Sequence, residues 1–184
     1  SVSGSCSSDS IAEHKEEILF SENFEGRKPR RFYGRIDKEN AQGTASAEGR
    51  RTSRSSEFET AVAFPLPRPV PVSSRTVLSF KYYIEKGIKF GFLLKGETEQ
   101  EKEFEAEKTL INFKQDTWET ITVPLSELTG TGTFTLGSSV TRLVFQAGYK
   151  NNDKDVKLYI DDIIIKDINS DIIPPHKPEK GFEI

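Results

Sequence analysis

Two stretches of the chain, residues 78–85 and 88–95, each alternate between two rows of side chains. A period of two is that of a β-strand, whose successive side chains point to opposite faces of a sheet. One row of each stretch is apolar and is expected in a core, and the other is expected on an open face. The apolar rows are Leu78, Phe80, Tyr82 and Ile84, and then Ile88, Phe90, Phe92 and Leu94.

Shorter apolar runs predict further strands, separated by clusters of Ser, Thr, Gly, Asn and Asp. About eight short strands without a sustained helical period indicate an all-β fold, an antiparallel β-sandwich. The four prolines of residues 65–71 have no N–H to donate, so this stretch is expected to be an extended loop or an edge crossing. The further strands are expected at Ile18–Phe24, Phe58–Phe64, Phe104–Phe113, Thr117–Pro124, Val140–Ala147 and Val156–Lys166.

The length of 184 residues fits one domain with tails. We expect an N-terminal tether over residues 1–17, the sandwich over 18–167 and a proline-rich tail over 168–184. The formal charge of −3 argues against a nucleic-acid-binding protein, and no run approaches the roughly 20 apolar residues of a membrane-spanning helix. The charge is uneven, because residues 26–56 carry nine Lys and Arg against three acidic residues.

Cys6 is the only cysteine, so it cannot form an internal disulfide. Its surroundings, Ser1 to Ser10, resemble the end of a bacterial lipoprotein signal, in which the cysteine carries the lipid. Ser3 departs from that pattern, which prefers a branched apolar residue there. The resemblance implies a lipid anchor at Cys6 and a secreted or cell-surface, extracytoplasmic protein. The alternative is an N-terminal tail with an incidental thiol.

Three segments have a familiar order and spacing: Phe20–Gly26, Asp116–Leu128, and Val140–Gln146 leading to Leu158–Ile165. Together they resemble the galactose-binding-domain-like jelly rolls, which include many carbohydrate-binding modules of bacterial polysaccharide-degrading enzymes. The resemblance covers residues 18–167 and implies an antiparallel jelly-roll β-sandwich. It is specific for the fold and not for the ligand, because proteins of this fold bind glycans, lipids or proteins.

Asp162 is an anomaly in the last predicted strand. With Leu158 and Ile160 facing inward, strict alternation would send Asp162 inward too, where a carboxylate needs hydrogen bonds, a cation or a local bulge. The resemblance implies a structural Ca²⁺ between the opening segment and this strand, held by Glu25 and Asp162 with Glu22 and backbone carbonyls as helpers. The alternative is that Asp161 and Asp162 lie solvated on a twisted strand end, or accept backbone N–H bonds.

The open face provides the hypothesis for a ligand site. Opposite the apolar rows, Lys81, Tyr83, Lys89 and Gly91 are expected to face outward across neighbouring strands. Sugars favour aromatic planes with polar side chains, and acidic sugars also favour Lys and Arg. The alternative is a solvated sheet covered by loops. Further candidates are Arg142 and Gln146 at outward positions of a later strand, Trp118 before its strand, and Tyr33 and Tyr149 in loops.

Glutamates occupy every odd position from Glu97 to Glu107. On one continuous strand they would share a face and repel each other. We therefore expect the chain to turn near residues 96–101 and to leave the remaining glutamates on a solvated strand. The alternative is an acidic patch that faces a cation or a basic partner.

The residue types argue against catalysis. Both histidines, His14 and His176, lie in the expected tails, which removes His-based triads and most zinc sites. No pair of acids stands out as a glycosidase pair, and no glycine-rich phosphate loop occurs. The sequence predicts a non-catalytic module that binds a polysaccharide or oligosaccharide, including an acidic one, near an enzyme or transporter. The alternative is a structural or protein-interaction module of a larger assembly.

Overall fold

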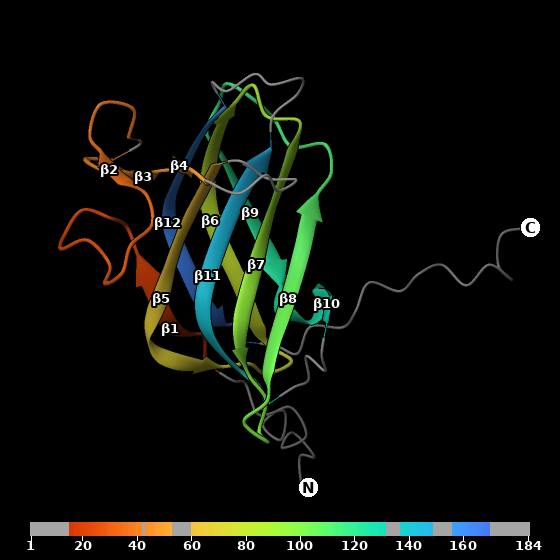
Figure 1. Cartoon of the computed structure of the whole chain (residues 1–184). Helices are drawn as coiled ribbons and strands as arrows, with labels where there is room; N and C mark the ends of the chain where they lie inside the picture. Colours follow the sequence, from red (N-terminus) through yellow and green to blue (C-terminus); the bar gives the residue numbers. More distant parts are fainter. Residues whose placement is uncertain (1–14, 42, 53–59, 132–136, 149–155, 170–184) are drawn as a thin grey trace, which may run out of the picture.

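The computed structural model describes residues 15–41, 43–52, 60–131, 137–148 and 156–169, and it forms two antiparallel sheets packed face to face (Figure 1). Sheet A has the order β2-β3-β12-β6-β9, and β1 pairs with the same edge of β12 as β3 does. Its strands are β1 (Glu17–Glu22), β2 (Arg35–Asp37), β3 (Ser46–Glu48), β6 (Thr76–Glu85), β9 (Glu119–Pro124) and β12 (Lys157–Asp167).

Sheet B has the order β10-β8-β7-β11-β5-β4 and lies in front of sheet A in Figure 1. Both sheets are antiparallel, as the jelly-roll β-sandwich requires, so the predicted all-β fold class is confirmed. The strands of sheet B are β4 (Arg50–Arg51), β5 (Thr60–Pro71), β7 (Lys89–Glu97), β8 (Glu103–Leu110), β10 (Thr129–Thr131) and β11 (Ser139–Gly148).

The core lies between the sheets and is rich in phenylalanine. Phe80 of sheet A packs against Phe92 and Phe145 of sheet B, with ring centroids 5.6 and 4.8 Å apart. A second cluster joins Phe24, Phe32 and Phe64 near β1. Burial of such rings is the main stabilising term of a sandwich of this size.

The alternating rows of β6 and β7 face the core as predicted, except for Ile88. This side chain is 49% exposed because it lies in the turn before β7 begins at Lys89. A second expectation is also wrong. β6 and β7 are consecutive in the chain but belong to different sheets, so they are not neighbouring strands.

The proline-rich stretch forms the second half of β5. Its residues pair with β11 on one side, whereas β4 reaches only Thr60 and Ala61 on the other. The prolines therefore lie along an open edge, as their missing N–H groups require.

The glutamate run is divided as expected. β7 ends at Glu97, residues 98–102 form the turn, and Glu103, Glu105 and Glu107 are exposed on β8. Lys95 forms an ion pair with Glu105 across the strands at 3.3 Å.

β1 begins at Glu17 and β12 ends at Asp167. Most residues of the two expected tails lie outside the described residues, so the division into a domain and two tails stays a prediction. No helix in the described part of the chain is long and apolar enough to cross a membrane.

Candidate functional site

A row of outward-facing side chains crosses one end of sheet A. The row runs across four strands. Tyr83 of β6 is paired with Tyr159 of β12, and Tyr159 is paired in turn with Glu48 of β3. Glu48 is paired with Arg35 of β2. At the other end of this row, the ring of Trp118 lies 5.8 Å from that of Tyr83, just before β9 begins. We call Trp118, Tyr83 and Tyr159 the aromatic row.

The three rings of the aromatic row differ in how far they are buried. Tyr159 is 3% exposed, and burial, followed by the charges of Glu48, Asp37 and Glu85, raises its pKa to about 12. It is therefore a neutral phenol that supports the ring of Tyr83, 5.9 Å away. Tyr83 and Trp118 are only half-buried, so these two rings are the ones that a ligand can reach.

Polar groups lie on the same face as the aromatic row. The Tyr83 hydroxyl donates to Glu85 Oε1 at 3.3 Å, and loss of hydration followed by the Glu85 charge raises the pKa of this phenol. Lys81, one outward position further along β6, forms an ion pair with Asp162 at 2.9 Å. Thr120 of β9 is opposite Lys81 and is exposed.

Three of the predicted ligand residues, Lys89, Arg142 and Gln146, lie on the opposite side of the molecule. They face outward from β7 and β11 of sheet B, where Gln146 is between Ala61 and Gly91, and Arg142 is between Pro65 and Lys95. The structure thus divides the predicted open face in two, because β6 belongs to sheet A and β7 to sheet B. It brings together Lys81, Tyr83 and Trp118. Lys89, Arg142 and Gln146 share the other face but are spread along it, because Arg142 is opposite Lys95 and Lys89 is opposite Gly148.

Tyr33 lies at the edge of sheet B. Its backbone forms a bridge to Ala63, its hydroxyl donates to the carbonyl of Arg51, and the Arg50 guanidinium lies 5.8 Å from its ring centre. Tyr33 therefore positions β4 beside the sandwich. Tyr149 lies outside the described residues, as do Cys6, His14 and His176.

Asp162 does not face the core, because β12 contains a bulge at this point. The register with β6 shifts between Asp161 and Ile164, and Asp162 has a left-handed φ of 46°. The bulge turns the Asp162 side chain toward Lys81 and solvent. The structure thus shows the local bulge among the explanations for Asp162, together with a cationic partner, Lys81.

The three predicted calcium ligands, Glu22, Glu25 and Asp162, do not form one group. Glu22 accepts the backbone N–H of Phe24 at 2.8 Å, and Asp162 is paired with Lys81. Among the described residues, no group of three or more His, Cys, Asp or Glu side chains could hold a metal ion. Glu25 and Asp162 both act by their charge on the buried carboxylate of Asp161, and Glu25 also accepts the N–H of Thr44 at 2.9 Å.

Asp161 is the buried acid of the last strand. It is 2% exposed, and burial, together with the charges of Asp162 and Glu25, raises its pKa to about 6. Its Oδ1 accepts the N–H of Asp162 at 2.8 Å. The pairing of Ile160 with Ala47 places Ser46 opposite Asp161, and the fully buried Ser46 Oγ has no hydrogen-bond partner among the described residues. Two carboxylates and an unpartnered hydroxyl are oxygen donors of the kind that Ca²⁺ prefers.

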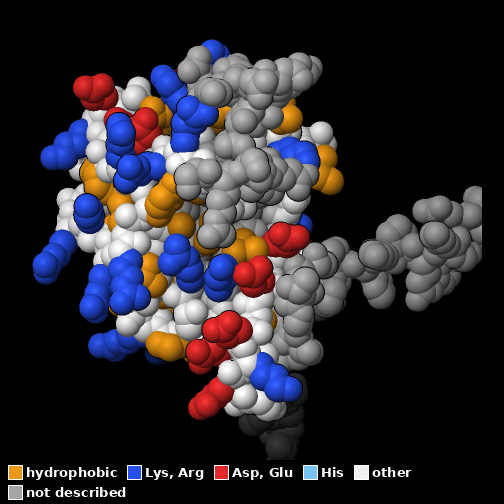
Figure 2. Space-filling model, in the orientation of Figure 1, with side chains coloured by type: hydrophobic (Ala, Val, Ile, Leu, Met, Phe, Trp, Pro, Cys, Tyr) orange, Lys and Arg blue, Asp and Glu red, His pale blue; other side chains and the backbone are white. Residues whose placement is uncertain are grey.

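Basic side chains gather on one side of the molecule. Residues 26–56 carry a net charge of +6, from nine basic and three acidic residues, so the rest of the chain carries −9. In Figure 2 the blue side chains crowd the left of the view, where Figure 1 shows β2 to β5. The described part of this segment gives one side of the molecule an excess of basic side chains.

The chain matches no known family model and no curated protein. Its fold is similar to that of several solved structures. The family 11 carbohydrate-binding module of the cellulosomal cellulase Lic26A-Cel5E of Clostridium thermocellum superposes with a TM-score of 0.57 at 17% identity, over 84% of this chain and 95% of that one. The CBM22-1 xylan-binding domain of Xyn10C from Paenibacillus barcinonensis superposes with a TM-score of 0.52 at 17% identity, over 86% and 99%.

A family 30 carbohydrate-binding module gives a TM-score of 0.56 at 16% identity, over 84% of this chain and 95% of that one. These likenesses extend over nearly the whole length of each module, and identities this low bear on the fold and not on the ligand. The chain has the jelly-roll β-sandwich fold of the carbohydrate-binding modules, as its resemblance to galactose-binding-like domains predicted.

Proposed function

We propose that this protein is a non-catalytic carbohydrate-binding module that holds a polysaccharide on the outer face of sheet A. The observation that supports this most directly is the aromatic row, where the accessible rings of Tyr83 and Trp118 lie 5.8 Å apart. Flat aromatic rings bordered by polar side chains suit a sugar, which has an apolar ring face and polar hydroxyls. Lys81, Glu85 and Thr120 would bind the hydroxyls.

The polysaccharide that we propose is acidic. The net charge of +6 over residues 26–56 supports this preference, since Arg and Lys bind anionic groups. The protein would act outside the cytoplasm, as a secreted module or as a lipoprotein anchored at Cys6, and keep an enzyme or transporter near its glycan.

A structural calcium ion is part of the proposal. Glu25 and Asp161 would hold it, with Ser46 and backbone carbonyls completing the ligand set, so Asp161 replaces the Asp162 of the sequence prediction. The ion would supply positive charge between two carboxylates that otherwise repel each other. Its role would be to tie the segment after β1 to β12.

The test is calorimetric titration with a panel of neutral and acidic polysaccharides, on the wild type and two variants. Tyr83→Ala is expected to weaken binding roughly tenfold or more, as removal of a central aromatic contact commonly does. Arg142→Ala, on the opposite sheet, is the matched control and is expected to bind like the wild type.

Two results would contradict the proposed site or function. Loss of binding in Arg142→Ala, with Tyr83→Ala unaffected, would move the site to sheet B. A folded wild type that binds no polysaccharide would favour the protein-interaction alternative.

A further inference from the structure

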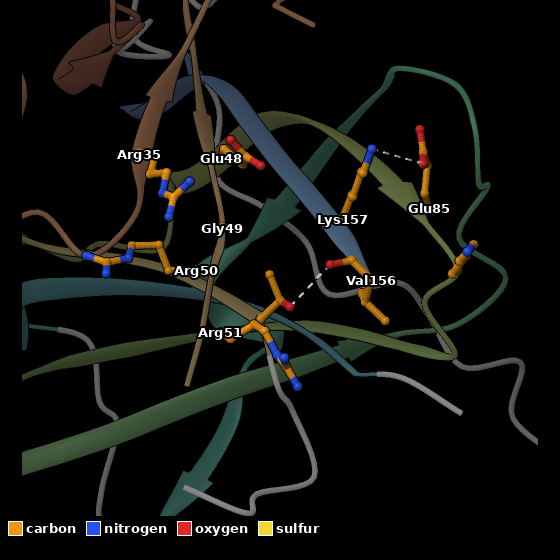
Figure 3. Close-up of a pocket in the computed structure, with 10 residues that line it drawn as sticks. Arg35, Glu48, Gly49, Arg50, Arg51, Glu85, Val156 and Lys157 are labelled. Carbon is orange, nitrogen blue, oxygen red and sulfur yellow. Dashed lines mark hydrogen bonds and ion pairs between the residues drawn. The ribbon is translucent and has the colours of Figure 1, made fainter. Parts of the chain in front are cut away.

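A pocket of about 650 Å³ opens at the end of the sandwich beyond the aromatic row (Figure 3). Strands β2, β3 and β4 form one wall, and the end of β6 and the start of β12 form the other. Five basic side chains line it, Arg35, Arg50, Arg51, Lys86 and Lys157, against the two carboxylates Glu48 and Glu85. The pocket therefore has a strong excess of positive charge.

The acids of the pocket do not neutralise this excess. Glu85 is shared between the Tyr83 hydroxyl and Lys157, whose Nζ lies 3.9 Å away. Arg50 lies against the ring of Tyr33. The guanidinium groups of Arg35 and Arg51 are exposed and form no ion pair within the described part of the chain. Two guanidinium forks are therefore available to a ligand.

We infer that this pocket binds the carboxylate of a uronic acid residue, so that the ligand of the module is a carboxylated polysaccharide. This inference rests on the proposed function and names its substrate class. The planar guanidinium fork matches a carboxylate with two parallel hydrogen bonds, which makes Arg the preferred residue for this group. A sulfate ester has the same negative charge, and the experiment below includes it as a separate ligand.

The position of the pocket fits a chain that also uses the aromatic row. Arg35 and Tyr83 belong to one cross-strand row, separated by three strand intervals. At about 4.8 Å per interval they are roughly 14 Å apart along the face. A short oligosaccharide that lies across the strands would place one sugar ring on Tyr83 and the carboxylate of another residue at Arg35.

The experiment compares three ligands by calorimetry: oligogalacturonate, its methyl ester, and a sulfated galactan. The methyl ester keeps the sugar backbone and removes the charge. The wild type is expected to bind the acid form roughly tenfold tighter than the ester, since each hydrogen bond to a charged group contributes on that scale. The double variant R35A/R51A is expected to bind both forms equally.

Two matched variants test the direction of the effect. Arg68→Ala also removes one exposed positive charge but lies on β5 outside the pocket, and it is expected to keep the preference for the acid form. Glu48→Gln removes a negative charge from the pocket wall and is expected to tighten binding of the acid form. All four side chains are at the surface or half-buried, and an unchanged melting temperature would show that the variants fold.

The possible failures are distinct. Equal binding of acid and ester, lost in Tyr83→Ala, would overturn the pocket inference and the preference for an acidic polysaccharide. It would leave carbohydrate binding on sheet A standing. Preference for the sulfated galactan over oligogalacturonate would replace the carboxylate by a sulfate. Absence of binding to any polysaccharide would overturn both the function and the inference.

Discussion

Asp161 and Asp162 differ in environment although they are adjacent in the chain. The bulge in β12 leaves Asp161 buried on the outer face of sheet A and turns Asp162 toward Lys81 and solvent. A buried carboxylate without a cation is costly in its charged form, and the raised pKa of Asp161 expresses that cost. The role of each acid is therefore decided by one backbone irregularity.

In the calcium-free protein, the free energy of unfolding should decrease as the pH rises from about 4 to about 6. The folded pKa of Asp161 is raised to about 6 from 3.8, so between these values the folded state binds more protons than the unfolded state. Urea unfolding in EDTA at several pH values should show this decrease in the free energy of unfolding. Asp161→Asn should remove the part of the decrease that comes from Asp161. Glu103→Gln, at an exposed position on β8, is the control. An unchanged slope in Asp161→Asn would contradict the assignment.

Close backbone approach decides the pairing of β7 with β11. Gly96 is opposite Val140, next to a bulge in β11, and a Cβ atom there would overlap the carbonyl oxygen of Ser139 and lie 2.6 Å from Phe104 Cζ. Only glycine allows the two strands and the ring to meet at this point. The pairing of β7 with β11 thus depends on the absence of a side chain at Gly96.

Gly96→Ala should therefore lower the free energy of unfolding by about 1–3 kcal/mol, the usual cost of overpacking. Chemical denaturation measures this value. Gly26→Ala is the control, because a Cβ at Gly26 meets no atom within 4 Å. Equal stability of the two variants would show that β11 can shift without cost.

At the scale of the whole molecule, the aromatic, basic and acidic features lie on different parts of the surface. Sheet A carries the aromatic row, the basic pocket lies beside it, and the acidic β8 lies in sheet B. The proposed calcium ligands come from the segment after β1 and from β12, which are far apart in sequence. An ion held between them would stabilise the folded state only, because the unfolded chain does not bring them together.

Calcium at 100 times its Kd should thus stabilise the protein by about 2.7 kcal/mol. For a chain of this length that corresponds to a rise in Tm of about 5–10 °C, measurable by calorimetry with calcium against EDTA. Glu25→Gln should lose most of the rise, whereas Glu22→Gln should keep it, since Glu22 is engaged with the N–H of Phe24. A Tm that does not respond to calcium would refute the site.

The fold class and the longer strands follow from the sequence, because strand periodicity and proline chemistry are local. The short strands β2, β3, β4 and β10 were not predicted. The rows of β6, the division of the glutamate run and the open edge at residues 65–71 all follow from neighbouring residues. Such patterns identify the two faces of a strand, but they do not identify the sheet to which it belongs.

Which side chains meet depends on the tertiary structure. The chain crosses from one sheet to the other between β6 and β7, which separates Lys81 and Tyr83 from Lys89, Arg142 and Gln146. Cross-strand pairing brought Tyr159 to Tyr83 and Arg35 to Glu48, over sequence distances that no periodicity spans. Because of the bulge, Asp161 is the buried acid and Asp162 faces Lys81 and solvent, whereas alternation had predicted that Asp162 would be buried. Long-range pairing and backbone irregularity are collective properties of the packed chain, which is why the site depended on the fold.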